Sequence, residues 1–155
     1  MEWSIHPIGG SGEQWDAWEA MFSPRDAATE YPQPMFDALT GEIDRAVVVM
    51  WADHDIGRLV REDWETHGPI VMERVRVHCG ELDSFYLDGA VRHFKRDVET
   101  LATQNGGWQG PGYVELFPGE THDSVLPRIR PRINDEMREH FRAHGVEPTP
   151  ADSAR

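Results

Sequence analysis

The alternation of apolar and polar positions is clearest in the second half of the chain. Residues 72–79 alternate between apolar and polar side chains, which predicts a strand with one buried face. Residues 87–103 repeat apolar positions at helical spacing, and residues 113–117 form a short apolar run that predicts a second strand. The last helical pattern covers residues 133–144 and ends at a glycine. The order of these elements predicts a strand–helix–strand–helix unit.

Two loops of this unit follow the carboxyl ends of the predicted strands, a position where parallel sheets often carry functional residues. A strand, a long helix and a second strand form a crossover whose two strands run parallel. In open α/β sheets, functional residues lie in the loops that follow the carboxyl ends of the strands. The loops in that position are residues 80–84 and residues 118–123.

The first half of the chain has weaker patterns. Residues 14–22 fit one face of a short helix, which Ser23-Pro24 stops because the residue before a proline avoids helical dihedral angles. Residues 42–51 fit either a β-branched strand or a helix face, and we favour two short helices in this region. Asp53 or Asp55 would cap the second helix, whose apolar side chains are expected to point inward: Ile56, Leu59, Val60 and Trp64.

Composition limits the classes of partner. The 155 residues carry a net charge of −13, which repels phosphate backbones and anionic lipids, so we expect neither nucleic-acid nor membrane binding. The basic residues Arg128, Arg130 and Arg132 are interpreted as a helix-entry segment. The single cysteine, Cys79, excludes an intrachain disulfide and is expected to be buried, with His78 on the opposite face of the strand.

The sequence shows no targeting segment. Its first residues lack the basic region and apolar stretch of a secretory signal, and no apolar run approaches the roughly 20 residues that span a bilayer. We therefore expect a soluble protein, cytoplasmic by default, whose compartment stays unknown because a signal could lie upstream. Hydrophobic residues make up 39% of the chain, so its core is expected to be modest or completed by something else.

Two residues in the strand-end loops carry the candidate chemistry. Asp83 follows the first strand and His122 follows the second, so both side chains are expected at the same edge of the sheet. A carboxylate that accepts the Nδ1–H of a histidine fixes its tautomer and stabilises imidazolium. We therefore predict Asp83 as the acid and His122 as the base of a catalytic triad. The simpler alternatives are a turn or helix cap for Asp83 and a surface-loop position for His122.

The same loops resemble those of a known family. Residues 75–87, VRVHCGELDSFYL, look like the vGe-D-nfYL stretch of an esterase family within the α/β-hydrolases, and residues 117–122, FPGETH, resemble its PG-x-x-H histidine loop. The aromatic and acidic segments 15–25 and 51–56 are similar to the excursion that such proteins place before their last two strands. The order Asp then His also agrees with the order Ser, Asp, His of α/β-hydrolases. The resemblance covers residues 10–145.

The resemblance implies an α/β fold, the C-terminal part of an α/β-hydrolase. It predicts a helical and irregular excursion over residues 1–70, then the last two strands of an incomplete parallel sheet with flanking helices over residues 71–145, and a disordered tail over residues 146–155. It implies hydrolysis of carboxylic esters through a Ser-His-Asp triad, a small-molecule ester as the substrate of the complete enzyme, and neither a metal nor a cofactor. The open edge of an incomplete sheet would also permit self-association.

The serine of that triad is missing. None of the chain's serines lies in a G-x-S-x-G elbow, and the closest, Ser11 in GGSGE, lacks the final glycine. Loss of a triad nucleophile typically costs on the order of 10⁶ in kcat, so this chain alone is expected to be inactive. It would then be a gene fragment, the product of a gene whose start was assigned too late, or a truncated paralogue.

Two other functions stay open. A non-catalytic interaction module would use the open sheet edge or the tryptophan-rich first half, where Trp15 and Trp18 could form a carbohydrate platform. A metal-dependent hydrolase would use Asp53-His54-Asp55, although consecutive side chains diverge and converge poorly on one ion.

Overall fold

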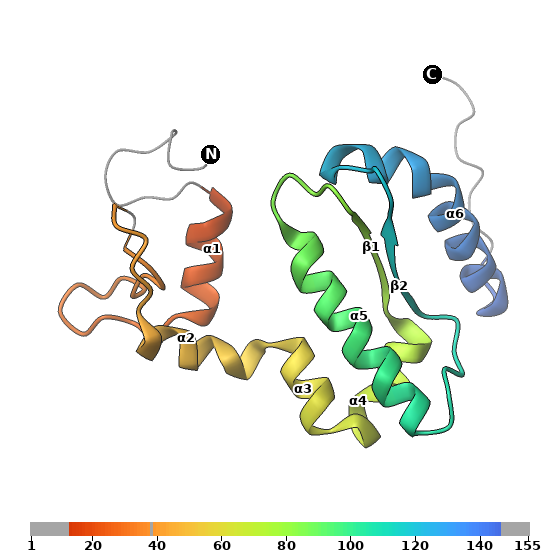
Figure 1. Cartoon of the computed structure of the whole chain (residues 1–155), viewed down its shortest axis with the longest axis horizontal. Helices are drawn as coiled ribbons and strands as arrows, with labels where there is room; N and C mark the ends of the chain where they lie inside the picture. Colours follow the sequence, from red (N-terminus) through yellow and green to blue (C-terminus); the bar gives the residue numbers. More distant parts are fainter. Residues whose placement is uncertain (1–12, 38, 147–155) are drawn as a thin grey trace. The chain divides into compact units, whose positions relative to one another are not determined.

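The structure, a computed structural model, describes residues 13–37 and 39–146. They form a mixed α/β chain with helices and a two-stranded parallel sheet, and the chain divides into two compact units, the second of which begins at Pro69 (Figure 1). The predicted glycine-rich opening before residue 13 and the predicted tail beyond Val146 lie outside the described residues.

The first unit consists of short helices joined by turns. Its elements are α1 (Glu13–Phe22), α2 (Arg45–Trp51), the 3₁₀ turn η2 (Ala52–His54), α3 (Ile56–Glu62) and the start of α4 (Trp64–Arg74). This confirms the early helix and the preference for helices over a strand at residues 42–51. Isolated antiparallel bridges join Arg25 to Pro32 and Phe36 to Ile43 in the connection between α1 and α2.

Aspartates begin two of these helices. Asp44 accepts the N–H of Ala46 at 2.8 Å at the start of α2, and Asp55 accepts the N–H of Gly57 at 2.9 Å at the start of α3. Such caps satisfy backbone donors that have no partner within the helix. The predicted cap at Asp55 is therefore confirmed. The predicted inward face of this helix is only partly correct, because Val60 is buried but Ile56 is 64% exposed.

The predicted first strand was too long. Residues 72–74 belong to α4, and the strand β1 is Arg76–Gly80. Val75 lies four residues after the buried Val71 and donates its N–H to the Val71 carbonyl oxygen at 3.2 Å. A short alternating pattern and the last turn of a helix look alike here, because apolar residues four apart satisfy both spacings.

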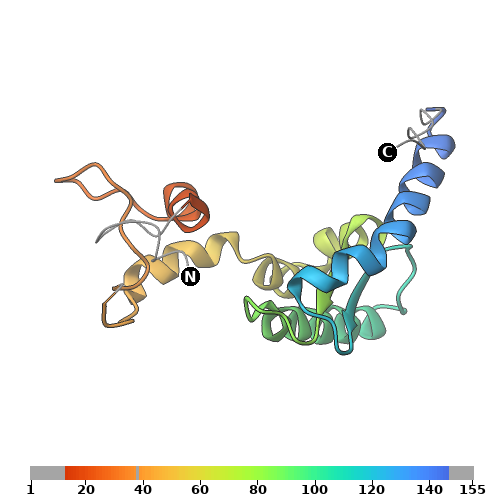
Figure 2. The ribbon, with the colours of Figure 1, turned by 90° about the horizontal axis from the view of Figure 1, so that it is seen from above.

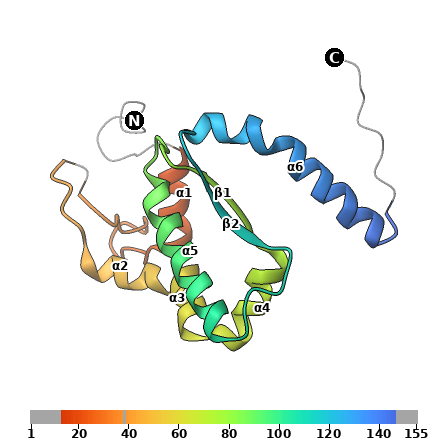
Figure 3. The same cartoon turned by 45° about the vertical axis from the view of Figure 1, so that its right-hand side comes forward.

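The second unit is a helix–sheet–helix layer structure. β1 pairs in parallel with β2 (Tyr113–Phe117), in a register that matches Arg76 with Tyr113 and Gly80 with Phe117. The helices α5 (Leu87–Gln104) and α6 (His122–Ala143) lie on opposite faces of this sheet (Figures 2 and 3). The predicted parallel crossover, its helix and its second strand are confirmed.

The core of this unit lies between the sheet and α5. Val98 and Ala102 of α5 are buried, as are Cys79 of β1 and Val114 of β2. These strand residues alternate with side chains that contact α6, as the pleat of a strand requires. The prediction that Cys79 is a small buried side chain is confirmed.

The last helix begins eleven positions earlier than predicted, at His122 rather than at residue 133. Pro127 and Pro131 lie inside it, and a proline normally removes a helical hydrogen bond and crowds the preceding turn. Val125 and Ile129, four residues apart, are both buried, so packing holds the first turns in place. The residues 128–132 therefore lie inside the helix and not at its entry. No helix within the described ranges is long and apolar enough to cross a membrane.

Candidate active site

Asp83 is held in a tight turn after β1. The N–H of Leu82 donates to the carbonyl oxygen of Glu120 at 2.9 Å, which ties this turn to the segment after β2. Oδ1 of Asp83 accepts the N–H of Phe85 at 2.9 Å. Among the described residues, Asp83 is the only charged residue that is buried, with 6% of its surface exposed. Hydrogen bonds from the backbone N–H groups of Leu82, before it, and Phe85, after it, therefore hold Asp83 in place.

His122 is the first residue of α6, and a capping box fixes its direction. Oγ1 of Thr121 accepts the N–H of Ser124 at 3.3 Å, while the N–H of Thr121 donates to Oγ of Ser124 at 2.8 Å. The carboxylate of Glu120 accepts hydrogen bonds from the Ser124 hydroxyl and from Arg128, each at 2.6 Å. His122 was expected in a loop. Its place at a capped helix start is more rigid than a loop would be.

The two predicted residues meet at the carboxyl ends of the strands. Nδ1 of His122 lies 2.9 Å from Oδ2 of Asp83. The Asp83 side chain is 3% exposed and that of His122 is 45% exposed, so the acid is enclosed while the imidazole reaches solvent. An ionised carboxylate can only accept, so Nδ1 carries the hydrogen and Nε2 is the unprotonated atom of the neutral ring. This geometry holds one tautomer of His122.

The surroundings of Asp83 keep it ionised. Burial by itself would raise the pKa of this carboxyl, but hydrogen bonds from His122 and from the N–H groups of Phe85 and Leu87 outweigh it. The pKa of Asp83 therefore lies below its ordinary value. A carboxylate that is charged and held in place is the state that orients a histidine base.

Two neighbours complete the pair's environment. The ring of Phe85 meets the His122 ring edge to face, with centroids 4.6 Å apart. Sγ of Cys79 lies 3.9 Å from Oδ2 of Asp83, and burial, followed by the Asp83 charge, raises the pKa of this thiol. A thiol held protonated is a poor nucleophile. As predicted, His78 lies on the other face of the strand, where it contacts Tyr113.

No hydroxyl of the described residues reaches the outward nitrogen of His122. Oγ of Ser23 accepts a hydrogen bond from Trp51, and Oγ of Ser124 donates to Glu120. Ser84 follows Asp83 directly in the turn and makes no hydrogen bond to His122. The structure thus brings together the predicted acid and base, and among residues 13–37 and 39–146 no hydroxyl forms a hydrogen bond with His122.

The side chains of Asp53, His54 and Asp55 each make a separate structural contact. Asp53 pairs with Arg58 at 3.2 Å, Asp55 caps α3, and the ring of His54 packs on Phe22 with centroids 4.9 Å apart. Within the part of the chain that the structure describes, no three histidine, cysteine or acidic side chains converge as a metal site would require. The three side chains diverge, as their adjacency in sequence suggested.

The tryptophans of the first unit pack against one another. Trp15 stacks on Trp51 with centroids 5.6 Å apart and meets Trp18 edge to face at 5.6 Å. Nε1 of Trp15 donates to Glu19, and Nε1 of Trp51 donates to Ser23. Stacked rings with satisfied N–H groups are typical of a small aromatic core.

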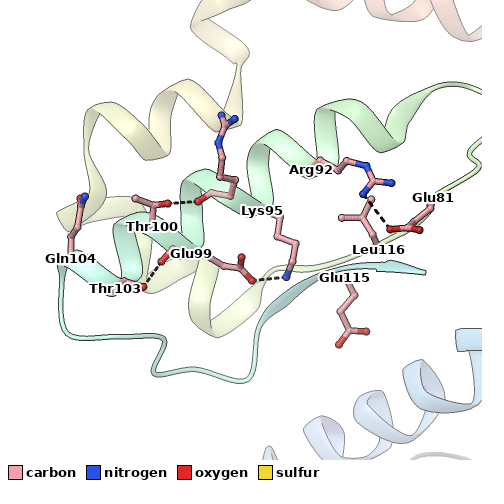
Figure 4. A pocket seen from close by; sticks show the side chains of 10 residues that line it. Glu81, Arg92, Lys95, Glu99, Thr100, Thr103, Gln104, Glu115 and Leu116 are labelled. Carbon is pink, nitrogen blue, oxygen red and sulfur yellow. Dashed lines mark hydrogen bonds and ion pairs between the residues drawn. The ribbon is translucent and has the colours of Figure 1, made fainter. Parts of the chain in front are cut away.

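A charged trough runs along α5 and β2, with side chains of both elements in its lining (Figure 4). It encloses about 800 Å³ and is lined by cations and anions in similar numbers. Arg92 pairs with Glu81 at 3.2 Å, and Lys95 pairs with Glu99. Because these charges are paired within the chain and neither Asp83 nor His122 lines the trough, we assign it no ligand.

Polar contacts that were not predicted from the sequence attach α6 to the sheet. Arg76 pairs with Glu136 at 3.1 Å, and the hydroxyl of Tyr113 donates to the same carboxylate at 3.0 Å. The guanidinium of Arg132 lies 3.9 Å from the centre of the Tyr113 ring. These contacts hold the helix whose first residue is His122. Alternating polar residues in both strands were the available signal. A helix that includes Glu136 was predicted, but nothing in the pattern indicated that it packs against these strands.

No family model, curated protein or solved structure matches this chain.

Proposed function

We propose that Asp83 and His122 are the acid and base of a serine-hydrolase triad that acts on carboxylic esters, in the C-terminal part of an α/β-hydrolase. The observation that carries this proposal is the 2.9 Å hydrogen bond between Oδ2 of Asp83 and Nδ1 of His122, at the ends of adjacent parallel strands. The resemblance of residues 75–87 and 117–122 to an esterase family supplies the class of reaction.

Each residue has a defined task in such a site. Nε2 of His122 takes the proton of a hydroxyl nucleophile as that group attacks the ester carbonyl, and it returns the proton to the leaving alcohol. Asp83 stays ionised, holds the Nδ1–H tautomer and stabilises the imidazolium that forms. No serine of the described residues hydrogen-bonds to His122, so the described part of the chain supplies two of the three groups.

The acid–base pair can be tested without the serine. The neutral imidazole Nε2 attacks the carbonyl of p-nitrophenyl acetate and expels p-nitrophenolate, and water then cleaves the acyl-imidazole to acetate and restores the ring. The test measures p-nitrophenolate release at about pH 8, where an ordinary imidazole is neutral. We expect a rate that depends mainly on His122 and is lost in His122→Gln.

Two variants give the test its controls. Asp83→Asn is expected to lower the rate by on the order of tenfold or more, because the new amide N–H would donate to Nδ1 and leave the hydrogen on Nε2. His93→Gln removes an exposed histidine of α5 and is expected to leave the rate unchanged. Equal rates in His122→Gln and the unsubstituted protein would overturn the proposal.

A second candidate, an interaction module, is favoured by the unequal edges of the sheet. In a parallel pair only alternate residues of each strand bond to the neighbour. The bond from Tyr113 N–H to the Val75 carbonyl shows that Val114 directs its backbone groups outward, and Nζ of Lys95 donates to the Val114 carbonyl oxygen at 2.9 Å. The outer edge of β2 is thus covered at Val114 by a lysine, a common means of blocking strand addition.

Within the described part of the second unit, no further strand pairs with the outer edge of β1, and no side chain forms a hydrogen bond with the backbone groups of Arg76 or His78. By the same alternation, Arg76 and His78 direct their backbone N–H and carbonyl groups outward. We infer that a second copy of this chain pairs here, antiparallel about His78. That register places Arg76 opposite Gly80 of the other copy and avoids opposed arginines.

Sedimentation velocity over a range of concentrations tests this pairing. Arg76→Pro removes an outward N–H at the first residue of β1, where proline is tolerated, and is expected to give a monomer. Arg76→Ala removes the same ion pair to Glu136 but keeps the N–H, so it is expected to dimerise like the unsubstituted chain. A monomer for the unsubstituted chain at every concentration would exclude the interaction module.

A further inference from the structure

The acid–base pair is bordered by an exposed apolar segment. From the residue before the buried Asp83 to the first residue of α5, four large apolar side chains face solvent: Leu82 at 63%, Phe85 at 56%, Tyr86 at 87% and Leu87 at 45% exposed. We call residues 82–87 the apolar loop, since four of its six residues carry a large exposed apolar side chain. Contiguous exposed apolar patches generally mark a binding surface.

Backbone geometry connects the apolar loop to the pair. Tyr86 has φ of 59°, a left-handed conformation that a tyrosine rarely adopts. Its N–H donates to the Asp83 carbonyl oxygen at 3.0 Å, and Oδ1 of Asp83 accepts the N–H of Phe85. The residue that orients His122 therefore also fixes the loop. Since Tyr86 is almost fully exposed, packing within this unit does not account for its unusual conformation.

Phe85, a residue of the apolar loop, contacts the ring of His122. Its ring touches the His122 ring, with centroids 4.6 Å apart, while more than half of Phe85 remains exposed. A group that approaches Nε2 of His122 therefore meets an aromatic surface at the same time. Tyr86 and Leu87 follow directly in the chain.

The charges near the apolar loop are anionic or already paired. Glu81 precedes the loop and Asp88 follows it, and Arg92 pairs with both, at 3.2 Å and 3.6 Å. Asp123 follows His122 in α6, and the whole chain carries −13. A negatively charged acyl group would be repelled here, whereas an uncharged hydrocarbon chain would cover apolar surface.

We propose that the apolar loop binds the hydrocarbon acyl chain of an uncharged ester whose carbonyl lies at Nε2 of His122. This inference rests on the proposed function and assigns its substrate class, esters of medium-length aliphatic acids. Each buried methylene contributes at most about fourfold to binding, and less where one side stays in solvent. We therefore expect on the order of a tenfold gain from a short to a medium chain.

A chain-length series measures this gain. The p-nitrophenyl esters of acetate, butanoate and octanoate are each compared with their reaction with free imidazole, which removes differences in intrinsic reactivity. The His122-dependent rate relative to imidazole is expected to rise along the series and to reach roughly tenfold at octanoate. Esters of the corresponding dicarboxylic half-acids, with a terminal carboxylate, are expected to lose the gain.

Variants assign the gain to the apolar loop. Tyr86→Asn keeps a residue that tolerates the left-handed conformation but removes the ring, and Leu82→Ser removes an exposed side chain while its backbone bond to Glu120 remains. Both are expected to lower the octanoate-to-acetate ratio severalfold. Met137→Ser removes a similarly exposed side chain from α6, roughly 22 Å along the helix from His122, and is expected to leave the ratio unchanged.

The outcomes separate the two proposals. His122-dependent release from acetate with no gain at octanoate overturns the acyl-chain inference and leaves the proposed acid–base pair in place. It would instead indicate that the apolar loop is covered by polypeptide in a larger assembly. A gain that survives in Tyr86→Asn and Leu82→Ser also overturns the inference. Absence of any His122-dependent release overturns both proposals.

Discussion

The carbonyl oxygen of Glu120 lies against Gly80, in the space that a Cβ atom of that residue would occupy. The turn that carries Asp83 and the segment that carries His122 therefore approach at a residue without a side chain. The bond from Leu82 N–H to the same Glu120 carbonyl, at 2.9 Å, closes the contact. Because backbone meets backbone here, main-chain contacts set the separation of the two segments that carry the acid and the base.

Gly80→Ala is expected to lower the free energy of unfolding by about 1–3 kcal/mol, because the added methyl group forces the two backbone segments apart. Urea denaturation measures this change. Gly89→Ala is the matched control, since Gly89 lies in α5 and a Cβ there would meet nothing within 4 Å. Replacement of a helical glycine by alanine should raise stability by roughly 0.5–1 kcal/mol. Equal stability of Gly80→Ala and the unsubstituted protein would contradict the contact.

Stability should depend on pH through Asp83. Its carboxyl has a folded-state pKa below the ordinary value of 3.8, despite burial, because His122 and backbone N–H groups donate to it. The stabilisation is therefore fully present above the ordinary pKa and is lost as pH falls through the folded value. At neutral pH, Asp83→Asn should cost about 1–3 kcal/mol, and the difference from the unsubstituted protein should shrink below about pH 4.

Urea midpoints measured between neutral and acidic pH test this linkage. Asp53→Asn is a suitable control, because that side chain is 75% exposed and most surface substitutions change stability by less than about 0.5 kcal/mol. A difference between Asp83→Asn and the unsubstituted protein that stays constant down to the acid limit would show that Asp83 is not held ionised by its partners.

The elements that the sequence predicted correctly are those with a strong local signal. The strand at residues 113–117 and the helix ended by Asn105-Gly106-Gly107 both have clear patterns and clear stops, and both are confirmed. Their order was enough to predict that Asp83 and His122 share one edge of the sheet, because parallel strands end on the same side. The 2.9 Å contact between these side chains agrees with that prediction. Their catalytic role remains a proposal.

Features that depend on contacts between distant segments were missed. The start of α6 was predicted too late because Pro127 and Pro131 are locally unfavourable, and the burial of Val125 and Ile129 helps to offset them. The cover that Lys95 provides over Val114 joins residues 19 apart and leaves no pattern in the sequence. Local propensity cannot show which helix face meets which strand edge.

Tyr113 should titrate at an unusually high pH. Burial, followed by its hydrogen bond to Glu136 and the charge of that carboxylate, raises the pKa of Tyr113 from 10.0 to about 12. The Tyr113 phenol therefore keeps its proton to a higher pH in the folded state than in the unfolded state. The stabilisation that follows from this difference is fully present below about pH 10 and declines between about pH 10 and 12. Ultraviolet titration of tyrosinate should show a late transition that is missing in Tyr113→Phe.

The Glu136→Gln variant separates the causes of this shift. It keeps a hydrogen-bond acceptor beside Tyr113 but removes the negative charge, so the late transition should move toward lower pH without reaching the ordinary value, because burial remains. An unchanged Tyr113 transition in this variant would mean that Glu136 does not contact the phenol in solution.

Lys95→Met should expose the outer edge of β2. The substitution keeps most of the aliphatic stem but removes the donor to the Val114 carbonyl oxygen, which should lower the free energy of unfolding by about 1–2 kcal/mol. Glu99→Gln is the informative control, because it weakens the ion pair of Lys95 but leaves the bond to Val114. If the lysine acts by covering the edge, Lys95→Met should associate at lower protein concentration than Glu99→Gln in sedimentation velocity. Equal association of the two variants would show that the lysine serves the ion pair alone and does not protect the β2 edge from pairing.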